Sequence, residues 1–190
     1  MVLNFFRLRI AHLRQICHLF ISFTSTYLAW ELGSETWTLK DNIMPAYGFK
    51  KNTVFLNDDN MMKWIEFAFT KSVAHFKRAS LTKVEFALLI AIILSKSDAK
   101  NLSPEGKELL LNESIKYTKI LLRYNQRILG LIEGASRLDE CFRLINRSIE
   151  NEFTLGLMLS HQLKYYSTCK DYFKCSNFMK KFFEKVIKKE

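Results

Sequence analysis

Histidine and cysteine are among the residue types in this 190-residue sequence that most often support catalysis or bind a metal ion. They are His12, His18, His75 and His161, and Cys17, Cys141, Cys169 and Cys175. A zinc site needs such ligands in close pairs, and a nucleophile needs a neighbouring base. No Cys-x-x-Cys pair occurs, and the spacing of His12 and His18 does not place them on one helix face. The sequence therefore predicts no metal site, no cofactor and reduced, buried thiols.

Glycine motifs give no sign of catalysis either. Gly130 and Gly134 form a Gly-x-x-x-Gly spacing between two amphipathic segments, where helix ends explain both glycines without a ligand. The sequence contains no Gly-x-Ser-x-Gly nucleophile motif and no glycine-rich phosphate loop. We therefore expect no catalytic residues and predict that the protein is not an enzyme.

Helices must position whatever functional side chains the protein has. The chain is 48% hydrophobic and 14% aromatic, with six glycines and two prolines, which favours one folded domain over disorder or a many-stranded β fold. Apolar residues recur with helical spacing in several segments. The expected helices are 5–32, 61–76, 81–94, 104–129, 135–166 and 173–188, and Trp37–Leu39 is expected to be a short strand. The prediction is an all-α single domain over residues 1–190 with one small β element.

Two neighbouring helices have distinctive sequences. Segment 81–94 is apolar nearly all round, which is typical of a helix in the centre of a globule. The next helix has a clear start, with Ser103 as N-cap and Pro104 at the first helical position. We expect Gly130 and Gly134 to break the chain before the following helix.

The formal net charge of +10 raises the question of nucleic-acid binding. Much of the excess lies at the two ends of the chain: segment 161–190 carries eight lysines against three acidic residues, and the first fourteen residues add three arginines. No compact basic stripe with interleaved aromatic residues and no DNA-reading module is present. We therefore expect no direct contact with DNA.

The N-terminus has the order of a secretory signal, with arginines followed by the apolar run 16–23. His18 interrupts that run, and helical apolar spacing continues to Leu32. The apolar stretches are also too short to span a bilayer, which takes about 20 residues. We therefore expect a helix here and no membrane partner, while a small secreted or membrane-associated protein remains an alternative.

The stretch 81–138 resembles the ligand-binding domain of nuclear hormone receptors, specifically the expanded group of orphan receptors in nematodes. The residues that carry the resemblance are Glu85 to Leu94, Ser97-Asp98-Ala99, Leu102 to Lys107, Tyr117 with Leu121 to Tyr124, and Glu133-Gly134-Ala135-Ser136-Arg137. Upstream, residues 25–37 are similar to the family's central helix and β-turn. The resemblance implies a layered antiparallel helical sandwich, here N-terminally truncated and without the zinc-finger DNA-binding module.

The resemblance also implies a pocket for a small lipophilic ligand beneath the β-turn, between the first and third long helices. Aromatic residues at this spacing usually belong to a helical core, which is the alternative interpretation of the same residues. The candidate ligand-binding residues are Phe20, Phe23, Tyr27, Trp37, Phe153, Leu157 and His161.

Two partner surfaces follow from the same resemblance. A groove for an Leu-x-x-Leu-Leu coregulator helix would use Arg14 with Phe182, Phe183, Val186 and Ile187, although Lys185 replaces the acidic residue of the family's closing activation helix. The alternative is that this segment is simply the last core helix. A dimer surface for a receptor partner would use Leu138, Cys141, Phe142 and Ile145, whose spacing also suits plain burial.

The function implied is transcription regulation in the nucleus, through a lipophilic ligand, coregulators or a dimer partner. The alternative within the same class is a ligand-free dimerisation or dominant-negative partner of another receptor.

Overall fold

The computed structural model describes residues 2–38, 44–47, 58–97 and 102–166, without the side chains of residues 2–11, 14, 15 and 163–166. Over these residues the chain is helical, which confirms the predicted all-α class. The elements are α1 (Val2–Glu31), α3 (Asp59–Ile65), the π-helix η2 (Glu66–Lys71), α4 (Ser72–Ala79), α5 (Lys83–Leu94), α6 (Pro104–Leu129) and α7 (Leu131–Tyr166). The expected helix 173–188 lies outside the described residues.

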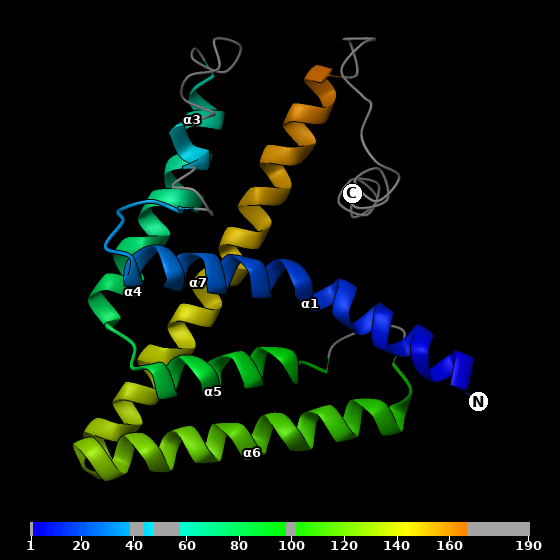
Figure 1. Ribbon diagram of the computed structural model, residues 1–190, viewed down its shortest axis with the longest axis vertical. Coiled ribbons are helices and arrows are strands. Elements are labelled where there is room, and N and C mark those ends of the chain that lie inside the picture. Colours follow the sequence, from blue (N-terminus) through cyan, green and yellow to red (C-terminus); the bar gives the residue numbers. More distant parts are fainter. Residues whose placement is uncertain (1, 39–43, 48–57, 98–101, 167–190) are drawn as a thin grey trace.

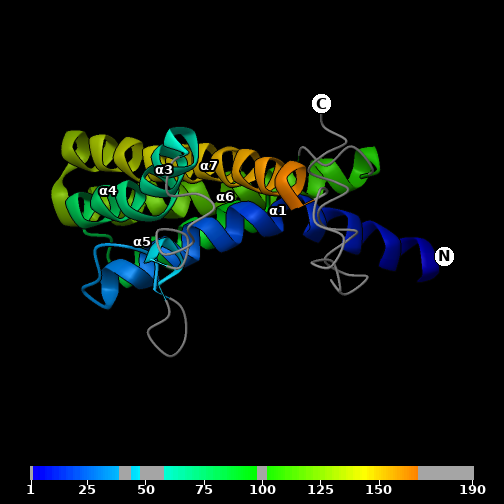
Figure 2. The same cartoon turned by 90° about the horizontal axis from the view of Figure 1, so that it is seen from above.

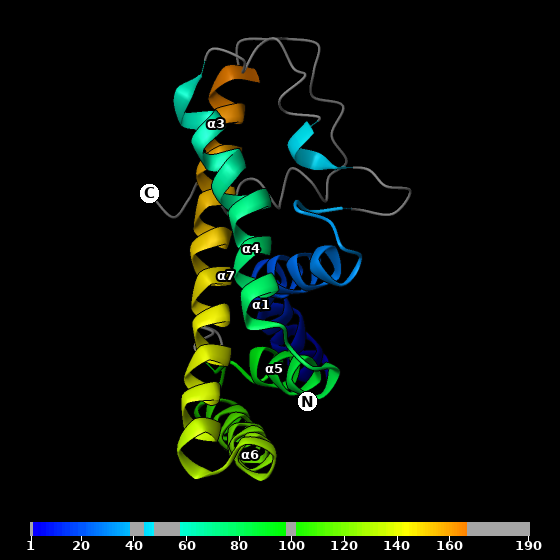
Figure 3. The ribbon, with the colours of Figure 1, turned by 90° about the vertical axis from the view of Figure 1, so that its left-hand side faces the viewer.

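The helices form two crossing layers (Figures 1 and 3). Helices α1, α5 and α6 lie side by side in one layer, and α7 packs beside the continuous rod of α3, η2 and α4 in the other. Figure 2 shows α1 and α5 on the same side of α7. Helix α1 crosses α7 about halfway along α7, whereas α6 meets α7 near the start of α7 (Figure 1), and α7 contacts every other helix of the described fold.

Local capping signals explain where several helices begin. Asp58 caps α3 by accepting a hydrogen bond from the Met61 amide at 2.9 Å. Ser103 caps α6, with Pro104 at its first position, as the sequence predicts. Thr82 and Glu85 form a reciprocal capping box at the start of α5. Each start is thus fixed by side-chain acceptors for amides that have no partner within the helix.

Two glycines at the turn between α6 and α7 behave differently. Gly130 ends α6 with a positive φ of 93°, in agreement with the prediction. The prediction that Gly134 breaks the chain is wrong, because Gly134 lies in the first turn of α7. A Cβ atom there would lie 2.5 Å from the Gln126 Cα atom. Gly134 therefore permits the close approach of α6 and α7.

The predicted strand Trp37–Leu39 is not formed at its described residues. Trp37 and Thr38 have no regular secondary structure, and Leu39 lies outside the described residues. The Trp37 amide donates to the Phe69 carbonyl oxygen at 3.0 Å, and its indole N–H donates to Thr26 Oγ1 at 2.8 Å. Trp37 is thus hydrogen-bonded to η2 and α1. A β-strand would instead need a neighbouring strand as the partner for its backbone hydrogen bonds.

Two hydrophobic clusters form the core. The larger includes Phe23, Phe76 and Leu89 and joins α1, α4, α5, α6 and α7, whereas the smaller surrounds Trp37 and Ile65 at the α3 end. Helix α5 lies between α1 and α6, as its apolar sequence suggests (Figure 1). Its outer side is not covered by these neighbours, however, because Val84 and Leu94 are 45% and 40% exposed.

Candidate functional site

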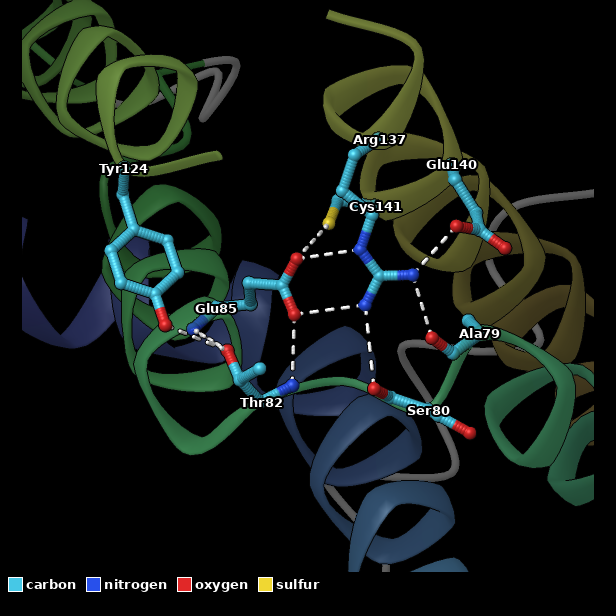
Figure 4. A network of polar contacts seen from close by, with 8 residues as sticks. All are labelled: Ala79, Ser80, Thr82, Glu85, Tyr124, Arg137, Glu140 and Cys141. Atoms are coloured by element: carbon cyan, nitrogen blue, oxygen red, sulfur yellow. Dashed lines mark hydrogen bonds and ion pairs between the residues drawn. The ribbon is translucent and has the colours of Figure 1, made fainter. Parts of the chain in front are cut away.

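The most densely connected polar site joins the starts of α5 and α7 to the end of α4 (Figure 4). Arg137 on α7 forms a bidentate ion pair with the carboxylate of Glu85 on α5, with Nε–Oε1 and Nη2–Oε2 distances of 2.6 and 2.8 Å. Its Nη1 atom donates to the Ala79 carbonyl oxygen and to Glu140 Oε2, both at 2.6 Å. One guanidinium therefore connects three helices.

Burial and hydrogen bonding act in opposite directions on this pair. Burial by itself raises the pKa of Glu85, but hydrogen bonds from Arg137 and the Thr82 amide outweigh it and hold that pKa below its ordinary value. The hydrogen bond to Glu85 raises the pKa of Arg137 further above its usual range. Both groups are therefore charged at neutral pH, and only 3% and 14% of their side chains is exposed.

Cys141 completes this site without making it reactive. Its Sγ atom lies 3.7 Å from Glu85 Oε1. Burial, together with the negative charge of Glu85, raises the pKa of Cys141 to about 12. The thiol is thus protonated near pH 7 and is a poor nucleophile. Because the Glu85 oxygens are also engaged, this cluster holds helices together and offers neither a general base nor a thiolate.

A second polar contact links the far end of α7 to the start of α3. His161 Nε2 lies 2.5 Å from Oδ2 of Asp58, the residue that caps α3 through its other oxygen. The Met61 amide, followed by His161, lowers the pKa of Asp58. The Trp64 ring stands edge-on to the imidazole, with centroids 5.7 Å apart. His161, a candidate ligand residue, therefore already has a partner within the chain.

The structure brings only some of the candidate ligand residues together. Phe23 and Tyr27 are buried and stack on Phe86 at centroid distances of 6.0 and 3.7 Å, and Phe20 packs in the same cluster. Trp37 belongs to the smaller cluster, and Leu157 is half-buried. Phe153 is 68% exposed. The seven residues thus do not line a single surface.

Buried polar atoms on α1 and α7 were not singled out by the sequence. Ser22 on α1 and Asn151 on α7 are fully buried, and the Ser22 Oγ and Asn151 Oδ1 atoms have no hydrogen-bond partner among the described residues. Asn151 Nδ2 donates to the Ala68 carbonyl oxygen of η2 at 3.4 Å, an oxygen that also accepts from Ser72 at 2.7 Å. Unsatisfied buried polar groups of this kind commonly bind a ligand atom or an ordered water.

The predicted partner surfaces are only partly described. Phe182, Phe183, Val186 and Ile187 lie outside the described residues, as does the side chain of Arg14. Of the proposed dimer residues, Cys141 and Ile145 are buried, and Leu138 and Phe142 pack against the larger core cluster. The structure therefore places that face of α7 largely within the chain's own core.

The sequence matches no known family model and no curated protein. Within the described residues, no group of three metal-ligating side chains gathers in one place. None of the helices in that part of the chain has both the length and the apolar character needed to cross a membrane.

The sequence indicates only part of the Glu85–Arg137 ion pair. Glu85 and Arg137 both lie in the stretches that carry the receptor resemblance, but no local pattern pairs residues so far apart. The Thr-x-x-Glu spacing of Thr82 and Glu85 is a capping-box signature, and it could have placed Glu85 at a helix start. The unpartnered atoms of Ser22 and Asn151 left no sequence signal, since both residue types are common on helix surfaces.

Proposed function

We propose that this chain is a ligand-binding domain of nuclear-receptor type that regulates transcription in the nucleus. It would act by binding a lipophilic ligand, a coregulator helix or a receptor partner, without catalysis and without contacting DNA directly. The proposal starts from the sequence resemblance, and its layered sandwich fold is supported by the two crossing layers of helices (Figure 3).

One observation carries the proposal. Two stretches of the resemblance, around Glu85 and Arg137, are 52 residues apart and contact each other through a buried two-pronged ion pair. Such a contact is expected if the resemblance extends over the whole of 81–138 in the family's order. A chance likeness in the short stretch around Glu85 gives no reason for Arg137 to meet it.

The ligand class proposed is a fatty acid or sterol lying between α1 and α7. The unpartnered Asn151 Oδ1 and Ser22 Oγ atoms would meet its polar group, since they belong to the two helices between which the resemblance places the ligand. A ligand that binds only the folded protein raises its melting temperature. We therefore expect selected lipids to raise the melting temperature of the full chain.

Variants distinguish a loss of ligand binding from a general loss of stability. Asn151→Leu removes the polar contact while keeping the side chain's bulk, so it should abolish the lipid-induced shift and leave the unliganded melting temperature near that of the wild type. Phe23→Trp should also reduce the shift, because it adds volume to a closed core. The matched control is Phe153→Ala, an exposed α7 position that should respond to lipid like the wild type. If no lipid shifts the wild-type protein, the ligand function is wrong.

Coregulator binding is tested separately. Fluorescence anisotropy with a labelled Leu-x-x-Leu-Leu peptide should report binding that is weakened by Phe182→Ala and Phe183→Ala. No binding at high micromolar protein would exclude the groove while leaving the ligand function to the thermal-shift test.

A second candidate is the ligand-free dimerisation or dominant-negative partner. It is favoured by the stacking of Phe23 and Tyr27 on Phe86, which uses those aromatic rings for packing within the chain. Under this alternative, lipids leave the melting temperature unchanged, and the chain binds a separate receptor ligand-binding domain in a pull-down with purified proteins.

A further inference from the structure

The turn between α6 and α7 presents four large aliphatic side chains to solvent within five consecutive residues. Leu131 and Ile132 are 74% and 81% exposed, and Ile128 and Leu129 are 59% and 47% exposed. The turn lies at an outer corner of the described fold in all three views (Figures 1, 2 and 3). We call these four residues the α6–α7 tip. Because they are neighbours in the chain, they form one apolar patch and not a set of scattered surface residues.

Backbone hydrogen bonds hold the α6–α7 tip in a fixed shape. The Gly130 amide donates to the Gln126 carbonyl oxygen at 3.0 Å, and the Gly134 amide donates to the Gly130 carbonyl oxygen at 2.9 Å. The Gln126 side chain also donates to the Leu131 carbonyl oxygen at 3.4 Å. A partner that binds the tip therefore loses little free energy in ordering it.

A row of four basic side chains leads along α6 to the tip. Their spacing of three or four residues places them on one side of the helix, opposite the buried Leu121 and Asn125. The four exposed residues of this cation row are Lys116, Lys119, Arg123 and Arg127. Segment 114–132 contains no Asp or Glu. Lys116 lies 3.5 Å from Glu113, whereas no ion pair within the described residues engages the other three. Uncompensated positive charge thus runs for about 17 Å beside the apolar tip.

The two parts of this surface together indicate the chemistry of its partner. The cation row attracts acidic groups, and the net charge of +10 favours an acidic partner over a second copy of the chain. The tip needs apolar side chains to cover it. A flexible protein segment with interspersed acidic and apolar residues supplies both, and it can wrap around an outer corner that a folded domain would have to match with a concave surface.

Nucleic acid and membrane fit this surface less well. A phosphate backbone would pair with the cation row but leave the tip uncovered, and the tip has no aromatic ring on which a base could stack. Insertion of the tip into a bilayer would carry Glu133 with it, because this exposed acidic residue directly follows Ile132 in the first turn of α7. Burying a carboxylate there is costly, and anionic head groups repel it.

We propose that the α6–α7 tip and the cation row bind an acidic segment of another protein, in which Asp and Glu lie between large aliphatic residues and which becomes ordered on binding. Its aliphatic side chains cover Leu131 and Ile132, and its carboxylates pair with Arg123 and Arg127. Asn151 lies about 28 Å further along α7 than Ile132, at 1.5 Å per helical residue. This surface is therefore separate from the proposed ligand contact and does not depend on it.

Fluorescence anisotropy with two labelled peptides tests the proposal on the full chain. One peptide consists of Glu-Leu-Asp-Leu repeats, and the other has the same charges with Ser in place of each Leu. We expect the leucine peptide to bind the wild type about 10-fold or more tightly than the serine peptide at about 0.15 M salt. Leu131→Ser/Ile132→Ser should remove that preference, and Arg123→Gln/Arg127→Gln should weaken binding of both peptides by about 10-fold or more.

A matched control removes two exposed cations elsewhere. Lys63→Gln/Lys77→Gln lowers the net charge by the same amount on α3 and α4, so it should bind the leucine peptide like the wild type. Melting temperatures show that each variant is folded, since all these positions are on the surface.

Three results would overturn the proposal. The first is no binding of the leucine peptide at high micromolar protein. The second is equal binding of the two peptides, or equal losses in the control and in Arg123→Gln/Arg127→Gln, which would show attraction by net charge alone. The third is tighter binding of phosphatidylserine vesicles or duplex DNA that is lost in the same variants, which would assign the surface to a membrane or to nucleic acid.

Discussion

Helix α7 contacts a neighbouring helix near each of its ends through a basic residue paired with an acidic one, and the two pairs differ in burial. Near its start, Arg137 holds Glu85, with 14% and 3% of the side chains exposed. Near its end, His161 holds Asp58, with 39% and 25% exposed. Each acid also caps the start of a helix, Glu85 in a capping box on α5 and Asp58 on α3. The same arrangement, a helix-capping acid paired with a basic residue of α7, thus occurs once in the interior and once at the surface.

The difference in burial determines how much each pair contributes to the free energy of unfolding. A buried charge that loses its partner stays desolvated and uncompensated, whereas an exposed one is returned to water and screened by salt. Breaking the Glu85–Arg137 pair should therefore cost much more stability than breaking the Asp58–His161 pair, although both contain a short contact. The following variants test this ranking.

Arg137→Ala should have the largest effect. It leaves the Glu85 carboxylate buried without its partner and removes a donor from the Ala79 carbonyl oxygen. We expect a loss of about 3–5 kcal/mol in the free energy of unfolding, measured by urea denaturation. The control is Arg143→Ala, which breaks an exposed pair with Asp139 on the same helix and should cost less than about 1 kcal/mol.

A double variant separates the burial penalty from the attraction itself. Glu85→Leu/Arg137→Met removes both charges and keeps an apolar side chain at each site, so it should be more stable than Arg137→Ala alone. A double variant as unstable as the single one would show that the guanidinium acts mainly through its contacts to α4.

Acid should unfold the protein partly through Glu85. The pKa of Glu85 is lowered in the folded state from its ordinary value of 4.5, so its contribution is complete above about pH 4.5 and is lost as the pH falls through the folded value. Glu85→Gln should therefore flatten the decline of stability below that pH. Asp58, whose pKa is also lowered from 3.8, is closer to solvent, and Asp58→Asn should flatten the decline less. Urea midpoints measured from pH 7 down to pH 3 compare the two slopes, and equal slopes would contradict the ranking.

Local features of the fold were readable from the sequence because neighbouring residues determine them. Ser103 and Pro104 fix the start of α6 through hydrogen bonding and backbone geometry that involve only the first turn. The helical spacing in 5–32 likewise predicts α1, since burial of one face imposes the 3.6-residue period.

Features that depend on distant segments were not readable. Gly134 resembles a helix end in sequence, yet its role is set by the backbone of Gln126 in the preceding helix. Trp37 lies in a stretch suited to a strand, but the Phe69 carbonyl oxygen of η2 takes its amide. The outer side of α5 is apolar in sequence and exposed in the structure, because burial depends on which helices surround it.

The capping box of α5 should contribute less than the ion pair it supports. Thr82→Ala removes the Oγ1 acceptor of the Glu85 amide, a 3.2 Å hydrogen bond, while the Glu85 carboxylate still accepts from the Thr82 amide. We expect a loss of about 1 kcal/mol in urea denaturation. Thr82→Ser keeps the hydroxyl and should retain most of the stability. A loss as large as that of Arg137→Ala would mean that the box, and not the ion pair, holds this site.

The smallest effect is expected at the exposed pair. Asp58→Asn keeps an oxygen for the Met61 amide but removes the charge facing His161, so it should cost less than about 1 kcal/mol at low salt and still less at high salt. Asp58→Ala loses the helix cap as well and should cost about 1 kcal/mol. Urea denaturation of both variants at two salt concentrations separates the cap from the charge. If Asp58→Asn costs as much as Arg137→Ala, the surface pair is energetically equivalent to the buried one and exposure does not rank them.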